Sequence, residues 1–288
     1  MKIAWVADFR DIDRQGGAQL TNRLLTHFAF LQKKHQVVEI GLHNLTLTDK
    51  FLTGFDLYII NNWVEIYQHE PGKNFLNYIV DNKPFVRFVH DYDEKDNIPE
   101  TEPLRKKLFE KAKLVITLSP LHTATLKRIY PLPANTISIP PYIEDLFSDS
   151  GFRRLTDEVI GVGEVNERKG ILNFIEYAKQ NPQKRFHFFT WEKDTAKYKQ
   201  PNIYFYPPVN NHYLHIYYNM FDSFIHLPKW KEPFGRAVAE AYLSNCNMIV
   251  NDNIGFFSYK WDYKDREKIR EIISFAPRDF WLAVEKCI

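Results

Sequence analysis

Cysteine is scarce in this 288-residue sequence, which contains only Cys246 and Cys287. Two cysteines cannot build a disulfide framework, and neither has the spacing of a metal ligand, so we expect a reducing compartment. No apolar run approaches the roughly 18 residues of a membrane-spanning helix, and no secretory signal pattern is present. We therefore expect a cytoplasmic protein without a transmembrane segment.

The sequence also lacks a strong charge of one sign and is poor in glycine. Its 38 basic and 36 acidic residues leave a formal net charge of +2, which argues against tight nonspecific binding of nucleic acid by the whole surface. Local basic runs at 105–107, 127–128 and 229–231 are typical of solvated faces, although a functional use stays open. With 11 glycines in all, each cluster of glycine is informative.

Short apolar runs alternate with amphipathic stretches in the first half of the chain. This alternation is typical of a parallel sheet covered by helices on both faces. The expected strands are 2–9, 35–42, 56–61, 84–90, 113–119 and 136–141, and the clearest expected helices are 18–34, 102–112 and 120–130.

The polar stretch 140–154, which opens with two prolines, interrupts this pattern before it restarts. We predict two doubly wound, Rossmann-like α/β domains: an amino-terminal, acceptor-side domain 1–142 and a carboxyl-terminal domain 143–288, facing across a cleft. The last stretch, 263–288, predicts two helices broken at Pro277 that could pack back on the first domain. The second series of strands is expected at 157–165, 185–191, 202–207, 223–228 and 247–252.

Ligands of open α/β sheets bind outside the carboxyl ends of the strands, so those ends carry the candidate sites. Gly16 and Gly17 follow the first strand and precede a helix, where a backbone can approach an anion closely. The segment lacks the G-x-G-x-x-G pattern, which disfavours a nicotinamide cofactor. A simple turn is the alternative interpretation.

The segment "VHDYDEKD" (89–96) places His90 and Asp91 at the end of the expected strand 84–90. Asp91 and Asp93 form an Asp-x-Asp triplet, which in other sugar-transferring enzymes holds a divalent metal against a diphosphate. The alternatives are a solvated acidic loop and a histidine that is merely part of the core.

Two segments of the second half combine glycine with charge. In "GVGEVNERKG" (161–170), Gly163 is followed by Arg168 and Lys169 at an expected helix start, which suits a diphosphate. A common surface sequence is the alternative.

In "WKEPFGRAVAEAYLSNC" (230–246), Glu232 and Glu240 flank the pair Phe234-Gly235. Backbone N–H groups at Gly235 would face a phosphate, and the two carboxylates would accept hydroxyls on either side. This arrangement predicts a nucleoside diphosphate sugar as ligand. An amphipathic helix with one exposed glutamate remains the alternative.

Four segments together resemble the retaining glycosyltransferases of the GT-B fold, family GT4: "GGAQLTNRLL", "VITLSPLHTATLKR", "GVGEVNERKG" and "EPFGRAVAEAYLSNC". The resemblance covers roughly residues 1–255. The short chain, the "VHDYDE" loop and the "IGFFS" segment resemble the compact bacteriophage members. The chain departs from the family at Glu164, where an arginine is usual, and at Gln19, where a glutamate is usual.

The resemblance implies transfer of a hexose or pentose without a cofactor or a metal. Lys169 and Arg168 would stabilise the leaving diphosphate, Glu232 would hold the donor sugar, Glu240 would hold the ribose, and His90 would line the site near the anomeric carbon. The catalytic residues are then His90, Asp91, Lys169 and Glu232. The donor-binding residues are Gly16, Gly17, Gly163, Arg168, Lys169, Phe234, Gly235, Arg236 and Glu240.

Two other hypotheses stay open. One is a metal-dependent transferase that uses Asp91 and Asp93. The other is a non-catalytic protein that binds a nucleotide sugar, and the departure from the family at Glu164 supports it. The acceptor is also open between a saccharide, a lipid and a hydroxymethylated pyrimidine in phage-type DNA.

Overall fold

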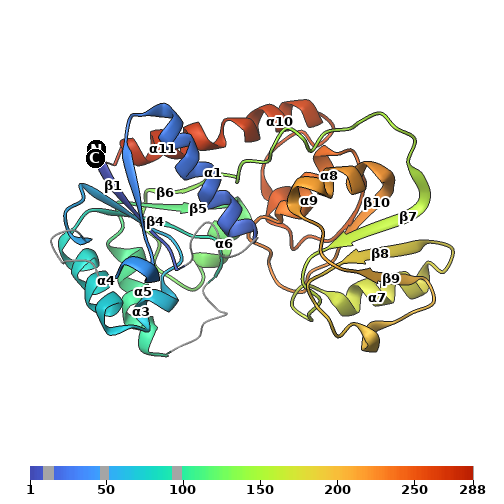
Figure 1. Ribbon diagram of the computed structural model, residues 1–288, viewed down its shortest axis with the longest axis horizontal. Coiled ribbons are helices and arrows are strands. Elements are labelled where there is room, and N and C mark those ends of the chain that lie inside the picture. The colour runs from blue at the N-terminus through green and yellow to red at the C-terminus, as the bar shows by residue number, and fades with distance from the viewer. Residues whose placement is uncertain (9–15, 46–51, 93–98, 288) are drawn as a thin grey trace. The chain divides into compact units, whose positions relative to one another are not determined.

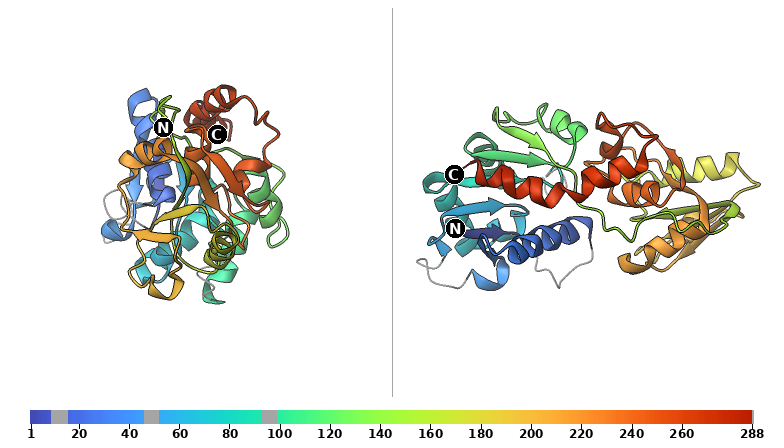
Figure 2. Two further views of the ribbon diagram at one scale, coloured as in Figure 1. Left: turned by 90° about the vertical axis from the view of Figure 1, so that its right-hand side faces the viewer. Right: turned by 90° about the horizontal axis from the view of Figure 1, so that it is seen from above.

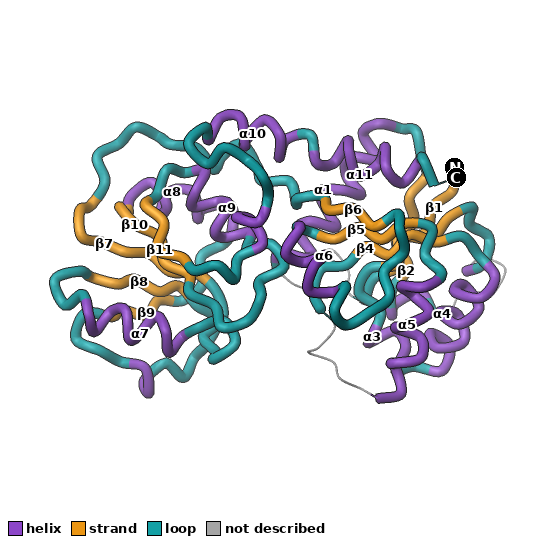
Figure 3. The backbone as a smooth tube through the Cα atoms, turned by 180° about the vertical axis from the view of Figure 1, so that it is seen from behind, coloured by secondary structure: helices purple, strands orange, loops and turns teal. Residues whose placement is uncertain are grey.

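The computed structural model describes residues 1–8, 16–45, 52–92 and 99–287. The chain forms two compact units, one of Met1–Tyr142 with Phe275–Ile288 and one of Ile143–Ser274 (Figure 1). Each unit has its own parallel sheet with helices packed against it (Figure 3).

The first unit contains a six-stranded parallel sheet in the order β2-β1-β3-β4-β5-β6. β3, β4 and β5 are buried at every position, which explains why their apolar residues do not alternate with exposed polar ones. Arg87 in β4 is the charged exception, and its guanidinium donates to the carbonyls of Ile60 and Phe88. The strands are β1 (Lys2–Val6), β2 (Gln36–Ile40), β3 (Leu57–Ile60), β4 (Phe85–Phe88), β5 (Leu114–Thr117) and β6 (Thr136–Ser138).

Proline in the first turn begins several helices of this unit, where its missing N–H would have no intrahelical acceptor. Ser119 caps α6 because its hydroxyl accepts a hydrogen bond from the His122 amide at 3.0 Å. The helices are α1 (Gly17–Gln32), α3 (Val64–Tyr67), α4 (Glu70–Asn82), α5 (Glu102–Glu110), α6 (Pro120–Leu126) and α11 (Ala276–Glu285), with short 3₁₀ turns at Leu42–Asn44 and Pro99–Thr101.

The last helix of the chain, α11, lies beside α1 (Figure 2). The indole of Trp281 donates a hydrogen bond to the Leu25 carbonyl at 2.9 Å, and the Trp5 ring contacts the rings of Phe280 and Trp281. α10 (Arg266–Ser274) belongs to the other unit, so the two units divide at Phe275, between the two terminal helices, and Pro277 lies in the first turn of α11.

The second unit contains a five-stranded parallel sheet in the order β11-β10-β7-β8-β9. α7 covers one face with an apolar cluster in which Phe174 packs edge-on against Phe186 and Phe188, while α8 and α9 lie on the other side (Figure 1). The strands are β7 (Leu155–Val162), β8 (Arg185–Phe189), β9 (Ile203–Tyr206), β10 (Phe221–His226) and β11 (Asn247–Val250). The helices are α7 (Ile171–Gln180), α8 (Asn211–Met220), α9 (Arg236–Leu243) and α10, with 3₁₀ turns at Ala196–Tyr198 and Gly255–Ser258.

The predicted fold class, two doubly wound α/β units, is confirmed. Among the helices that the structure describes, none is long and apolar enough to span a membrane.

Candidate functional site

The strand order of the second unit places a topological switch point between β7 and β10. From β7 the chain runs outward to β8 and β9, and then returns to the other side of β7 to form β10 and β11. Loops at such a point diverge, and this is where doubly wound sheets bind their ligands. The two loops that leave it are 163–170 and 227–235, the same two segments that the sequence singles out.

Gly170 holds these two loops against each other. Its φ of +83° lies in the left-handed region, and a Cβ there would stand 1.9 Å from the Leu227 carbonyl oxygen, so no other residue fits without moving the backbone. The amides of Lys229 and Trp230 donate to the Arg168 carbonyl at 3.1 and 3.4 Å. The close approach fixes Lys169 opposite the second loop.

An ion pair joins the loops at Lys169 and Glu232. The ammonium nitrogen lies 2.9 Å from Oε1 and 2.8 Å from Oε2 of Glu232, and the Trp230 indole N–H donates to Oε2 at 2.9 Å. His226, at the carboxyl end of β10, adds a longer contact of 3.6 Å to the same oxygen. The side chains of Lys169 and Glu232 are 20% and 13% exposed, so the pair is half-buried but open to a ligand.

Burial by itself would raise the pKa of the Glu232 carboxyl. Lys169 and His226 outweigh that effect and hold the pKa well below its usual range, so Glu232 is ionised at neutral pH. A carboxylate in this state is a strong hydrogen-bond acceptor and a weak base.

Trp230 organises the cations of the site with its ring face. The Arg168 guanidinium carbon lies 3.9 Å and the Lys169 ammonium nitrogen 4.7 Å from the ring centroid, both within the range of a cation–π contact. Glu164, which stands where the resembling family has arginine, accepts a hydrogen bond from Asn166, and Asn166 in turn accepts one from the Lys169 amide. The two cations are therefore held beside each other by one aromatic ring.

α9 begins directly after Gly235, whose φ of +86° again requires the left-handed region. The Phe234 ring is buried and packs against Phe256 at 5.6 Å, so any contact of Phe234 with a ligand would come from its backbone. The first amides of an α-helix have no intrahelical acceptor, and helix starts of this kind are common sites of anion binding.

Glu240 is more deeply buried than the sequence suggests, with 1% of its surface exposed. Its Oε1 lies 2.8 Å from Nε of Arg236, which is within ion-pair distance but without the alignment of a hydrogen bond. Arg236 also donates to Glu144 at 2.7 Å. Burial raises the pKa of Glu240 to about 7; Arg236 opposes this rise and the Glu144 carboxylate adds to it.

The first unit carries the other predicted residues. His90 follows β4, and its Nε2 lies 3.0 Å from Oδ1 of Asn22. The same oxygen accepts a hydrogen bond from the side-chain amide of Asn61 at 2.6 Å. Burial, with the neighbouring charges of His122 and Arg87, lowers the pKa of His90 to about 3, so the ring is neutral. The Asp91 carboxylate accepts a hydrogen bond from the next amide, that of Tyr92, at 2.8 Å.

The remaining predicted residues have simpler surroundings. Gly16 precedes α1, and a Cβ at Gly16 would meet nothing within 4 Å, so the space beside it is open. Gly17 is the first residue of α1, and Gly163 adopts a φ of +134° at the end of β7. Asp93 lies outside the described residues. Within the described ranges, no three His, Cys, Asp or Glu side chains gather closely enough to hold a metal ion.

Sequence reasoning missed three members of these clusters: His226, Trp230 and Glu144. Two of them have a signal in the sequence: His226 lies at the end of a strand, and Trp230 lies between two lysines. Glu144 has no such signal, because it lies 92 residues from Arg236 in the chain.

Comparison with known proteins supports the fold. Neither a family model nor a curated protein matches this sequence. Among solved structures, sucrose-phosphate synthase from Thermosynechococcus elongatus has a TM-score of 0.67 at 16% identity, covering 96% of this chain and 93% of its own. Anabaena HepE, in complex with UDP and glucose, has a TM-score of 0.65 at 16% identity over 98% and 91% of the two chains.

A glycosyltransferase from Rickettsia africae is also similar, with a TM-score of 0.64 at 13% identity over 99% of this chain and 93% of its own. The protein therefore has the two-sheet α/β architecture of the GT-B glycosyltransferases, and it has that architecture over nearly its whole length.

Proposed function

We propose that this protein is a retaining glycosyltransferase that moves a hexose or pentose from a nucleoside diphosphate sugar to a hydroxyl acceptor. The observation that carries the proposal is the Lys169–Glu232 ion pair at the β7/β10 switch point, beside Arg168 and the start of α9. Cations, helix amides and an ionised carboxylate at one sheet edge match a ligand that joins phosphate to hydroxyl groups. The resemblance of the "GVGEVNERKG" and "EPFGRAVAEAYLSNC" segments to family GT4 points the same way, as does that of the "VHDYDE" and "IGFFS" segments to its compact phage members.

The donor diphosphate would bind Arg168 and Lys169, with the amides after Gly235 completing the anion site. Glu232 would then accept hydroxyls of the donor sugar. We assign the ribose to Glu240. This carboxylate is buried, and Arg236 lies beside it as its counter-charge. HepE has been solved with UDP and with UDP-glucose, so uridine nucleotides are the first donors to test here.

In the transfer step the bond between the anomeric carbon and the β-phosphate oxygen breaks, and a bond to the acceptor oxygen forms on the same face. The acceptor proton passes to the leaving phosphate oxygen. Arg168 and Lys169 would stabilise the negative charge that develops on the diphosphate, and His90 of the first unit would contact the acceptor or the transferring sugar. Glu232 is too weak a base for proton abstraction, because its pKa is held low, and acts by positioning the sugar.

A thermal-shift screen of the purified protein with UDP, ADP, GDP, CDP, TDP and their glucose conjugates tests the donor. At about 100 times its dissociation constant, a ligand stabilises by about 2.7 kcal/mol. We expect one nucleotide series to raise the melting temperature of the wild type and not that of Lys169→Ala. Lys229→Ala is the matched control, because Lys229 lies in the facing loop and its ammonium group pairs, among the described residues, only with Glu167, at 4.0 Å. Absence of any shift across the whole series would overturn the proposal.

A further inference from the structure

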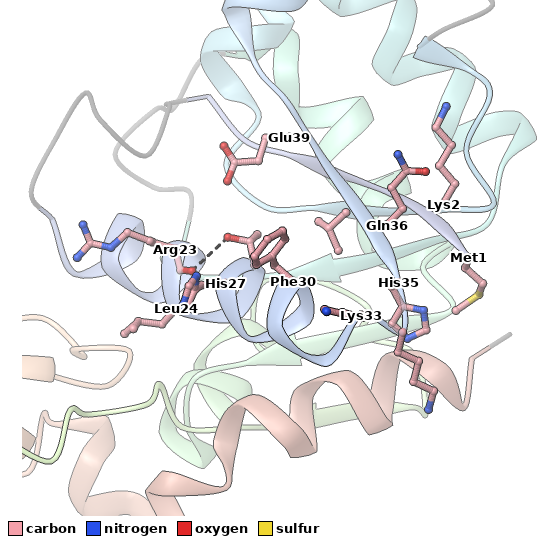
Figure 4. A pocket seen from close by; sticks show the side chains of 13 residues that line it. Met1, Lys2, Arg23, Leu24, His27, Phe30, Lys33, His35, Gln36 and Glu39 are labelled. Carbon is pink, nitrogen blue, oxygen red and sulfur yellow. Dashed lines mark hydrogen bonds between the residues drawn. The ribbon is translucent and has the colours of Figure 1, made fainter.

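An open groove of about 1150 Å³ runs along the first unit between α1 and the edge strand β2 (Figure 4). It lies wholly within this unit and contains none of the residues assigned to the donor. Arg23, His27 and Phe30 extend from α1, and Gln36 and Glu39 come from β2.

The groove concentrates positive charge in a chain whose net charge is nearly balanced. Lys2, Arg23, Lys33 and Lys34 line it, whereas Glu39 is its one carboxylate among the lining residues that the structure describes. Lys34 is paired with Glu285 at 2.5 Å, so part of the charge is already compensated. Four basic side chains against one carboxylate in the described lining favour an anionic occupant.

Aromatic rings stand among these cations. The Phe30 side chain is 72% exposed, and its ring stacks on that of His27 with a centroid distance of 6.4 Å and an interplanar angle of 24°. Arg23, His27 and Phe30 follow at helical spacing on α1, and Lys33 is the residue directly after the helix, so two rings lie between two cations. A bare phosphate or polyphosphate would leave these rings without a role.

We propose that this groove binds single-stranded nucleic acid. Exposed rings flanked by cations provide stacking surfaces and phosphate contacts at once, and every base has a face that can stack. A nucleic-acid strand fits into a concave groove. A flat bilayer would instead contact an apolar patch that protrudes from the surface. Single strands are favoured over duplexes because paired bases are already stacked on one another.

The groove also leads toward the carboxyl edge of the sheet. Arg23 and Glu39 line both the groove and a small adjoining hollow, which extends to Gln19, Asn22 and Gly41. Asn22 is the residue that contacts His90. A strand in the groove would therefore pass close to the acceptor side of the unit. The inference concerns binding alone and holds without the transfer reaction.

Fluorescence anisotropy with a labelled 20-nucleotide oligo-dT tests the inference on the full chain. We expect binding at low salt that weakens as salt rises. Phe30→Ala should weaken it by about 5-fold or more, the loss of one stacked base. Lys33→Asn removes one charge and keeps a residue that tolerates the left-handed backbone at this position (φ +53°), so the salt slope should fall by about 0.7.

Phe152→Ala and Lys179→Asn are the matched controls, because they remove an exposed ring and an exposed cation in the other unit; both should bind like the wild type. Circular dichroism checks that all variants are folded. The inference is overturned if oligo-dT does not bind, if Phe30→Ala binds it unchanged, or if phosphatidylglycerol vesicles are bound and oligo-dT is not. Equal binding of a duplex of matched charge, insensitive to Phe30, would also overturn it. None of these outcomes depends on the nucleotide-sugar screen, so the two proposals fail separately.

Discussion

Lys169 and Glu232 lie 63 residues apart in the chain, and the Lys169 ammonium nitrogen lies within 2.9 Å of both carboxylate oxygens of Glu232. The pair joins the loops that follow the two strands of the switch point. It therefore links the part of the site that suits phosphate to the part that suits hydroxyl groups.

Replacing Glu232 by glutamine should lower kcat/KM for transfer at least ten-fold. The substitution keeps the shape of the side chain and removes an ionised acceptor, and a hydrogen bond to a charged group contributes about 1.5–3 kcal/mol. Steady-state kinetics measure the effect. Glu167→Gln, at a carboxylate of the facing loop that is 74% exposed, is the control and should retain most activity. Wild-type turnover of Glu232→Gln would remove the central residue from the proposed mechanism.

Lys169→Ala should damage transfer more than Arg168→Ala. Lys169 contacts both Glu232 and the Trp230 ring, so its loss removes a phosphate ligand and leaves the Glu232 carboxylate without its main counter-charge. Arg168 contributes a stacked guanidinium beside it. Rates of both variants at saturating donor decide the ranking. The reverse order would mean that Arg168 is the principal diphosphate ligand.

Trp230 has two separable contributions, and two variants distinguish them. Trp230→Phe keeps a ring face for the cations but removes the hydrogen bond to Glu232, so we expect a loss of about ten-fold in kcat/KM. Trp230→Ala removes both and should lose more. Trp191→Ala, at an exposed tryptophan after β8, is the control. Equal activity of the alanine variant and the wild type would contradict a role for this ring.

Glu240 makes the stability of the fold depend on pH. Because its pKa rises from an ordinary 4.5 to about 7, the folded state binds a proton more tightly than the unfolded state. The free energy of unfolding should therefore fall as pH rises from about 4.5 to 7, by up to roughly 3 kcal/mol from this group, and level off above pH 7. Urea unfolding of wild type and Glu240→Gln across this range measures it.

The Gln variant also loses the ion pair with Arg236, which shifts its stability by an offset. The decisive quantity is the slope of the difference between the two proteins with pH. A difference that is constant from pH 4.5 to 7 would show that folding does not raise the pKa of Glu240.

The segment 90–96, which contains His90, Asp91 and Asp93, should act without a catalytic metal. We expect His90→Ala to reduce transfer, Asp93→Ala to have little effect, and activity to persist in EDTA. The lowered pKa of His90 also predicts no inflection from this residue near pH 6.5 in the pH–rate profile. If EDTA abolishes activity, manganese restores it, and Asp91→Asn and Asp93→Asn are both inactive, then Asp91 and Asp93 form a metal site.

Sequence patterns predict the architecture well here because both sheets are parallel and their central strands are buried. β3 is covered on both sides, so its apolar run is unbroken and easy to recognise, and β4 departs from this pattern only at Arg87. The glycines that begin α7 and α9 are equally readable, since Gly170 and Gly235 stand where the backbone turns left-handed.

The partners within the site could not be predicted, because they depend on strand order. Only the return of β10 to the side of β7 brings Lys169 to Glu232 and Trp230. Glu240 shows the same limit: its spacing from Glu232 indicates a shared ligand, whereas its burial beside Arg236 and Glu144 comes from the packing of α9 on distant residues. The periodicity of a helix predicts which of its faces is buried, but it does not predict which residues of other segments, such as Glu144, pack against that face.

The hydrogen bonds that Glu232 accepts within the protein have a consequence for how the proposed site would distinguish a nucleotide sugar from a free sugar. Both carboxylate oxygens accept hydrogen bonds from Lys169, and one of them also accepts from Trp230. A free sugar would have to compete with an ammonium group for the same oxygens. In the proposed mechanism a diphosphate would draw Lys169 toward itself and release acceptor capacity for a hydroxyl. Recognition of the sugar would then be conditional on recognition of the phosphates, so the abundant unactivated sugars of a cell would be rejected by the ion pair itself, without a separate excluding pocket.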